Sequence, residues 1–185
     1  LFFLKKLVGS GPVGVVYKAD GKPFTAGDGF HISKDKNPNR VGVEHVLGSV
    51  DNGETVQAAL TGDRVSVLIV LDAIPGGAPW DAALLEAMSK AETVIVVAYD
   101  DGPLTAAATV SFPALHWTQK DGTYVNGRGR LQRLRGAVSP PGDTRSDLEV
   151  LQELSCALGQ YPRIVSAGGA FRRLAAELPK SFKDI

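Results

Sequence analysis

The hydrophobic pattern is clearest in the middle of the chain. Continuous apolar runs, rich in β-branched residues, occupy Val65–Leu71 and Thr93–Tyr99, and each has the length of a buried strand. Between them, Trp80–Ala91 carries apolar residues at helical spacing. Strand, helix and strand in this order predict a βαβ unit, in which the strands are parallel and the crossover is right-handed. A third short strand is expected at Thr109–Phe112, which Pro113 ends.

The second half of the chain shows further helical and extended patterns. After the turn at Lys120–Gly122, short extended segments are expected at Thr123–Val125 and Leu131–Leu134. Apolar spacing predicts the remaining helices at Glu54–Leu60, Leu104–Ala108, Asp147–Leu158 and Ala170–Leu178. Gly159 is well placed to end the helix before it as a left-handed cap.

The first fifty residues are rich in glycine and proline. Only Val13–Tyr17 reads as a strand there, and the rest is expected to form turns and loop. Leu1–Val8 reads as the end of an amphipathic helix entered midway, so we interpret the chain as a fragment. We expect an irregular segment at 1–50 packed on the domain, an α/β domain at 51–160, and a C-terminal helix and tail at 161–185. The expected fold is α/β, with three layers and a mostly parallel sheet between flanking helices.

Composition argues against several functional classes. Lys+Arg and Asp+Glu both number 20, so the net charge is zero and no long-range field gathers nucleic acid or anionic lipid. The longest apolar run is far shorter than the roughly 20 residues of a membrane helix. Cys156 is the single cysteine, and the three histidines are scattered, so neither a disulfide framework nor a metal centre is expected. We therefore expect a soluble protein that does not insert directly into a membrane.

Candidate binding residues follow the predicted strands, because ligands in parallel sheets gather at the carboxyl ends of strands. Asp72, Asp100 and Asp101 lie there and could receive a guanine or a ribose. Acidic residues also end strands as turn formers, and both interpretations stay open. By position, Asp72 is the better nucleotide-binding candidate. His116 with Trp117 could be a site pair, although such pairs more often pack at the edge of a core.

A glycine-rich turn carries the other candidates. Gly122, Gly127 and Gly129 allow a sharp turn or a close approach, and Asn126 can cap the turn or adopt a left-handed conformation. Forked guanidinium donors suit a diphosphate, and the arginines of this region are Arg128, Arg130, Arg133 and Arg135. A solvated hairpin with basic residues facing water explains the same pattern and is the more frequent outcome. Gly168-Gly169 before the last helix could cradle phosphate, but a turn at the helix start is the simpler explanation.

Three consecutive segments carry a family resemblance. Residues 106–114 read A-A-A-T-V-S-F-P-A, residues 120–132 read K-D-G-T-Y-V-N-G-R-G-R-L-Q, and residues 140–154 read P-P-G-D-T-R-S-D-L-E-V-L-Q-E-L. Their order and spacing resemble the molybdopterin oxidoreductase superfamily, whose motifs include E-K-x-G-T-x-x-N-x-E-G-R-x-Q. Within it, the segments look most like the large iron–sulfur subunit of NADH:quinone oxidoreductase (respiratory complex I). More weakly, Lys36–Gly48 resembles a family loop, N-x-x-G-A-x-D-x-G.

The resemblance implies a set of cofactor-binding positions in a vestigial pterin site: Asp72, Thr105, Lys120, Gly122, Asn126 and Arg130. The chain departs from the family at three acidic positions, where it has Thr109, Gln119 and Arg128. These departures suggest drift where a demanding cofactor is no longer held. In the large iron–sulfur subunit this region is implied to be retained for structure, so no catalytic residue and no metal ligand is expected in this chain.

The resemblance also implies partners and location. Iron–sulfur clusters are expected on preceding polypeptide, with other peripheral-arm subunits of a respiratory complex as partners, in the cytoplasm at the inner side of the membrane. The alternative is the C-terminal cofactor-binding part of an active molybdopterin oxidoreductase, such as a formate dehydrogenase. A third possibility is an independent nucleotide-binding module. Cluster cysteines with a molybdenum ligand upstream would favour the enzyme, and clusters without that ligand would favour the vestige.

Overall fold

The computed structural model describes residues 1–16, 22–27, 29, 31–48, 53–62, 65–72, 82–160, 164 and 166–178. Its helices are α1 Phe2–Val8, α2 Arg40–Leu47, α3 Glu54–Thr61, α4 Ala82–Met88, α5 Pro103–Ala106, α6 Asp147–Ala157 and α7 Ala167–Glu177, with a 3₁₀ turn, η1, at Trp117–Gln119. Its strands are β1 Phe24–Thr25, β2 His31–Ile32, β3 Val67–Asp72, β4 Thr93–Ala98, β5 Val110–Pro113, β6 Gly122–Val125 and β7 Leu131–Leu134.

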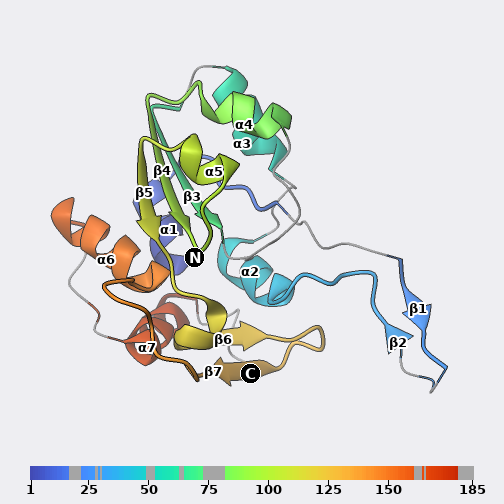
Figure 1. Cartoon of the computed structure of the whole chain (residues 1–185). Helices are drawn as coiled ribbons and strands as arrows, with labels where there is room; N and C mark the ends of the chain where they lie inside the picture. The colour runs from blue at the N-terminus through green and yellow to red at the C-terminus, as the bar shows by residue number, and fades with distance from the viewer. Residues whose placement is uncertain are drawn as a thin grey trace.

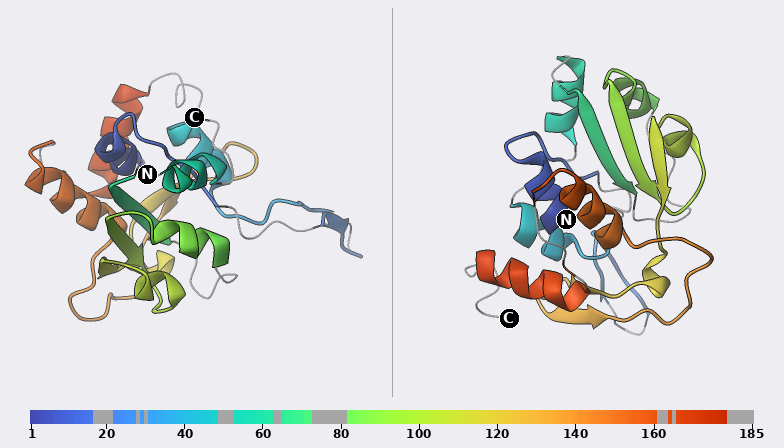
Figure 2. Two further views of the ribbon diagram at one scale, coloured as in Figure 1. Left: turned by 90° about the horizontal axis from the view of Figure 1, so that it is seen from above. Right: turned by 90° about the vertical axis from the view of Figure 1, so that its left-hand side faces the viewer.

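A three-stranded parallel sheet lies at the centre of the upper half (Figure 1). Strands β3 and β4 pair in parallel from Val67 opposite Thr93 to Asp72 opposite Ala98, and β5 joins the far side of β4, also in parallel. Helices α4 and α5 cover one face, and α1 and α6 lie against the other (Figures 1 and 2). The predicted three-layer α/β fold with a parallel sheet is confirmed.

Side chains of β4 alternate between the two faces, as the period of a strand requires. Val94 and Val96 pack with Met88 of α4 on one face, whereas Val97 packs with Val150 of α6 on the other. Val96 and Val97 are almost completely buried. Burying a valine contributes about 1.5–3 kcal/mol, so this strand anchors both helix layers.

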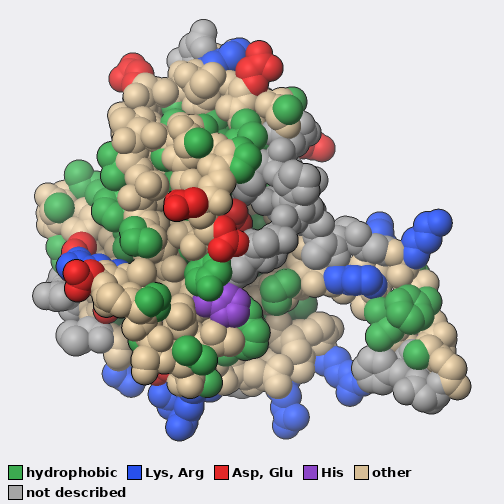
Figure 3. All heavy atoms as spheres, in the orientation of Figure 1, with side chains coloured by type: hydrophobic (Ala, Val, Ile, Leu, Met, Phe, Trp, Pro, Cys, Tyr) green, Lys and Arg blue, Asp and Glu red, His purple; other side chains and the backbone are tan. Residues whose placement is uncertain are grey.

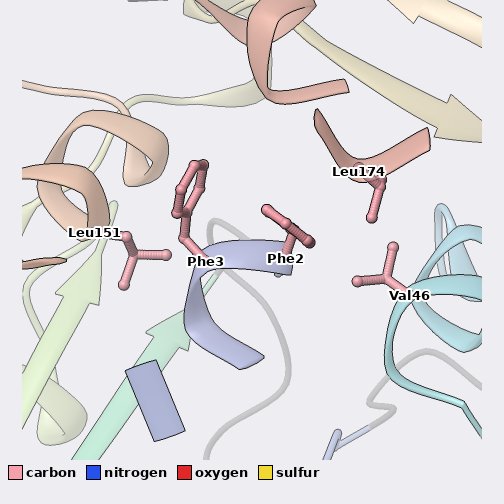
Figure 4. Packing of buried hydrophobic residues seen from close by; sticks show 5 residues of the cluster. All are labelled: Phe2, Phe3, Val46, Leu151 and Leu174. Atoms are coloured by element: carbon pink, nitrogen blue, oxygen red, sulfur yellow. The ribbon is translucent and has the colours of Figure 1, made fainter. Parts of the chain in front are cut away.

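A second core joins helices that are distant in the sequence (Figure 4). Phe2 and Phe3 of α1 point toward Val46 of α2, Leu151 of α6 and Leu174 of α7. The two phenyl rings meet edge to face at 5.3 Å between centroids, a favoured arrangement for aromatic pairs. This cluster couples the sheet to the lower part of the molecule.

The N-terminal fifty residues are more regular than predicted. Helix α1 occupies most of the expected partial helix, and α2 lies within the segment interpreted as the family loop at Lys36–Gly48. The strand expected at Val13–Tyr17 is wrong for residues 13–16, which have no regular structure, and Tyr17 lies outside the described residues. The glycines of this segment indicated a loop rather than a helix. Gly42 is nevertheless buried in α2, where it allows close packing.

The extended segments expected at Thr123–Val125 and Leu131–Leu134 are strands β6 and β7. They form their own antiparallel sheet, separate from the parallel one, and β6 contacts α2 and α7. Helix α7 begins at Ala167, which places Gly168-Gly169 inside its first turn, where the Ser166 hydroxyl accepts a hydrogen bond from the Gly169 amide at 3.1 Å. Trp80, at the predicted start of the helix before β4, lies outside the described residues.

The short β1–β2 pair extends away from the rest of the molecule as an arm (Figures 1 and 2). Phe24 in this arm is 55% exposed. Among the described helices, none is both long enough and apolar enough to span a bilayer.

Candidate functional site

The six predicted cofactor-binding residues lie in three parts of the structure. Asp72 ends β3 at the carboxyl edge of the parallel sheet. Thr105 lies in α5, on the face of the sheet that α4 also covers. The remaining four, Lys120, Gly122, Asn126 and Arg130, lie before and within the β6–β7 hairpin. The four members that are adjacent in sequence therefore lie in one region of the fold, whereas Asp72 and Thr105 lie at and after the carboxyl ends of β3 and β4.

Thr105 is committed to the start of α5. Its hydroxyl accepts a hydrogen bond from the Gly102 amide at 2.9 Å and donates one to the Gly102 carbonyl at 3.0 Å. Pro103 occupies the first helical turn, where a missing amide hydrogen costs nothing. The hydroxyl thus caps the start of the four-residue helix α5, which follows the carboxyl end of β4.

Lys120 forms an ion pair with Asp147 in the first turn of α6. The Lys120 Nζ to Asp147 Oδ2 distance is 2.5 Å, and the side chains are 17% and 30% exposed. The carboxylate is also favoured there by the positive end of the helix. Close by, Ala114 and Arg145 form an isolated parallel bridge. Together these contacts bind the segment after β5 to the start of α6.

Tyr124 lies beside this pair. Burial raises the pKa of its phenol above the ordinary value, and the negative charge of Asp147 raises it further. The phenol is therefore held in its neutral form by its surroundings. This residue was not among the sequence predictions, because its environment depends on the charge of Asp147, which lies 23 positions further along the chain.

Asn126 shapes the turn between β6 and β7. Its Oδ1 atom accepts hydrogen bonds from the amides of Arg128 and Arg130, both at 3.0 Å. Gly129 adopts φ +79°, whereas Asn126 does not adopt a positive φ, so the capping role is the correct one of the two predicted. At the other end of the hairpin, Gly122 pairs with Leu134.

The arginines of the hairpin face solvent. All four predicted candidates are exposed: Arg128, Arg130, Arg133 and Arg135. Arg133 lies 3.9 Å from an Asp121 carboxylate oxygen, and this pair is exposed on both sides. Figure 3 shows basic side chains along the lower edge of the molecule, below the hairpin. The solvated-hairpin interpretation therefore describes these residues as they are placed here.

A hollow of about 260 Å³ lies between the start of α2 and the hairpin. Asn39, with φ 63°, precedes α2, and its Oδ1 accepts a hydrogen bond from the Val125 amide at 2.8 Å. Asp35 also lines the hollow; burial opposes ionisation, yet hydrogen bonds from Asn37 and the charge of Arg40 hold its pKa below the ordinary value. Short polar residues alternate along the sequence just before α2, at Asp35, Asn37 and Asn39. This pattern is typical of turns and could have indicated the start of the helix.

The carboxyl edge of the sheet carries a cluster of three rings. The His116 ring lies 5.0 Å from the Tyr99 ring and 5.2 Å from the Trp117 indole, measured between centroids. Its Nδ1 atom lies 2.7 Å from the Thr118 hydroxyl. Figure 3 shows acidic side chains and a histidine close together on this face of the molecule. Trp117 is 48% exposed, which is not the environment of a residue packed at a core edge.

The six predicted residues do not line one common hollow among the described residues. Of the six, Asn126 alone lines the hollow beside α2. The side chains of Thr105, Lys120 and Asn126 all make hydrogen bonds within the fold. In the described part of the chain, no three His, Cys, Asp or Glu side chains are grouped as metal ligands would be. A cofactor-binding role for the six residues stays a prediction.

Comparison with known families decides the relationship. Residues 23–157, more than half of the chain, match molybdopterin oxidoreductase. The chain belongs to the molybdopterin oxidoreductase family. The match includes all three motif segments and extends upstream through α2 and the parallel sheet. The predicted family is thereby confirmed.

Individual relatives cover only part of the chain. The chain is 35% identical over 101 residues, 55% of its length, to NADPH-Fe(3+) oxidoreductase subunit alpha of Geobacter sulfurreducens. It is 32% identical over 124 residues, 64% of its length, to F420-dependent formate dehydrogenase 2 subunit alpha of Methanococcus maripaludis. It is 28% identical over 110 residues, 60% of its length, to an NADH-quinone oxidoreductase subunit of Rickettsia typhi. The matches span 12%, 18% and 15% of these relatives.

Proposed function

We propose that this chain is a structural, non-catalytic α/β part of the large iron–sulfur subunit of an NADH-quinone oxidoreductase. In this role it supports electron transfer from NADH to quinone, which iron–sulfur clusters on other parts of the polypeptide carry. Its partners are other subunits of the peripheral arm, and it lies in the cytoplasm, peripheral to the inner side of the cell membrane. The similarity to the Rickettsia subunit supports this assignment.

The Lys120–Asp147 ion pair carries the proposal. Lys120 belongs to the motif before β6, and Asp147 belongs to the motif that opens α6. Because the Lys120 side chain is only 17% exposed and its ammonium nitrogen lies 2.5 Å from a carboxylate oxygen, its charge is neutralised within the fold. The side-chain Oδ1 atom of Asn126 is also engaged within the fold, because it accepts two amide hydrogen bonds of its own turn. Two motif residues therefore hold segments of the fold together.

Substitution of motif residues in the intact protein tests the proposal. Lys120→Met should lower the free energy of unfolding by about 1–3 kcal/mol, because Asp147 loses its partner. NADH:quinone electron transfer per assembled complex should stay unchanged. Arg130→Ala, at an exposed position, should change neither quantity, and Arg135→Ala is its matched control. Loss of turnover by Arg130→Ala in fully assembled protein would contradict the structural role.

A cofactor-binding part of an active molybdopterin oxidoreductase is the second candidate. The observation that favours it is the formate dehydrogenase relative, which is more identical to the chain, and over more residues, than the Rickettsia subunit. In that case Arg130→Ala should lower the bound pterin and formate oxidation together, while Arg135→Ala leaves both unchanged. The same pair of variants thus separates the two candidates.

A further inference from the structure

The carboxyl edge of the parallel sheet combines exposed aromatic rings with acidic side chains. Tyr99 follows β4 directly and is 44% exposed, and Trp117 in η1 is 48% exposed. The half-buried His116 ring contacts both of them, in tilted rather than stacked arrangements. Asp100 and Asp101, the next residues after Tyr99, are both exposed. The result is an aromatic surface with carboxylates along its margin.

We propose that this surface docks an arginine-bearing segment of a neighbouring subunit. The inference rests on the proposed function, since it assumes assembly with other subunits. A guanidinium group is planar, stacks on aromatic faces and pairs with carboxylates through two parallel hydrogen bonds. On this surface Tyr99 and Trp117 offer the aromatic faces, and Asp101 offers a carboxylate. Tyrosine, tryptophan and arginine are also the residues that dominate binding energy at protein interfaces.

Charge complementarity selects this occupant. The chain as a whole carries no net charge, so the attraction is local to the carboxylates beside Tyr99. An apolar partner would cover the rings but leave the Asp101 carboxylate desolvated without a counter-charge, which is costly. A lysine supplies charge but cannot stack as a planar group. An arginine satisfies the rings and the carboxylate at once.

Hydrogen bonds fix the backbone turn that carries Trp117. His116 precedes η1, its backbone amide donates to Gln119 Oε1 at 2.9 Å, and its Nδ1 lies 2.7 Å from the Thr118 hydroxyl. The Thr118 carbonyl in turn accepts hydrogen bonds from the Ala137 and Val138 amides. Little backbone ordering is then needed when a partner binds, which favours affinity.

The test compares subunit association in the intact complex isolated with variant chains. Trp117→Ala and Asp101→Lys should each raise the dissociation constant of the neighbouring subunit about tenfold or more. Asp101→Asn should have a smaller effect in the same direction, because it removes the charge without reversing it. The matched controls are Leu158→Ala, which truncates another exposed apolar side chain, and Asp143→Lys, which reverses another exposed acid; both should leave association unchanged.

Each alternative outcome is decisive. Unchanged association in Trp117→Ala and Asp101→Lys overturns the proposal, as does isolation of the full protein as a single polypeptide. Stabilisation of the protein by GDP that Trp117→Ala abolishes, with association intact, also overturns it and assigns the rings to a nucleotide. Should Trp117→Ala fail to fold, the Asp101 variants carry the test. Molybdenum measured in the same preparations reports separately on the proposed function, so either claim can fail alone.

Discussion

Single residues of the family motifs have roles that only the folded chain reveals. Lys120 could be identified from its motif, but its partner Asp147 lies 27 positions away and belongs to a different motif. Asn126 could be predicted more closely, because its hydrogen bonds reach only two and four residues along the chain. Local capping is therefore readable from sequence, whereas a contact across the fold is not.

The environment of Tyr124 makes the free energy of unfolding fall as the pH becomes alkaline. Its folded-state pKa is raised above the ordinary value of 10.0, so the unfolded chain releases the phenolic proton first as pH rises. The contribution of this residue is complete below about pH 10 and is lost as pH climbs toward its folded-state pKa. Tyr124→Phe should therefore flatten the fall in unfolding free energy above pH 10, measured by urea unfolding.

Unfolding curves of wild type and Tyr124→Phe at neutral pH provide the baseline for this comparison. The Tyr124 phenol is protonated there in both the folded and the unfolded chain, so its titration makes no contribution. Parallel curves for wild type and Tyr124→Phe across the whole range above pH 10 would show that Asp147 and burial do not act on this phenol as described.

At the level of elements, the regular hydrophobic runs were the reliable signal. The two long strands and helix α6 occur within one or two residues of their expected bounds, because each has a strong period and clear end signals. Helix α2 was missed because Gly42 and the preceding asparagines read as loop. The separate β6–β7 sheet could not be foreseen, since the choice between extending the parallel sheet and packing on α2 and α7 is a tertiary one.

The junction of α2 with β6 depends on Asn39 and gives a sharp prediction. Asn39→Ala should cost about 2 kcal/mol, because it loses the hydrogen bond to Val125 and retains a left-handed backbone that alanine disfavours. Asn39→Gly loses only the hydrogen bond and should cost about 1 kcal/mol. Chemical denaturation of the three proteins measures both values.

Gly42 supplies the control for this junction. A Cβ atom at Gly42 would lie 2.1 Å from Asn39 Oδ1, so Gly42→Ala should displace the asparagine side chain and destabilise the protein. In the Asn39→Gly background that clash is absent, and the same change should stabilise the helix by up to about 1 kcal/mol. Equal effects of Gly42→Ala in both backgrounds would contradict the described geometry.

For the whole molecule, family membership and fold could be predicted from the sequence, but the contacts that the motif residues make within the fold could not. Three motif segments spaced along the second half of the chain predicted the molybdopterin oxidoreductase family, and the match over residues 23–157 confirms it. The resemblance presented the motif residues as parts of one binding site. In the folded chain, Thr105 closes α5 while Lys120 and Asn126 hold the hairpin region together.

The molybdenum content of the full protein tests the central claim most directly. Elemental analysis of the purified assembly, combined with pterin fluorescence after oxidation, gives the ratio of each to the polypeptide. A motif region that serves structure alone predicts that neither reaches stoichiometric amounts, even when the host supplies both in excess. One pterin or one molybdenum per polypeptide, lost on Arg130→Ala and retained in Arg135→Ala, would contradict the account.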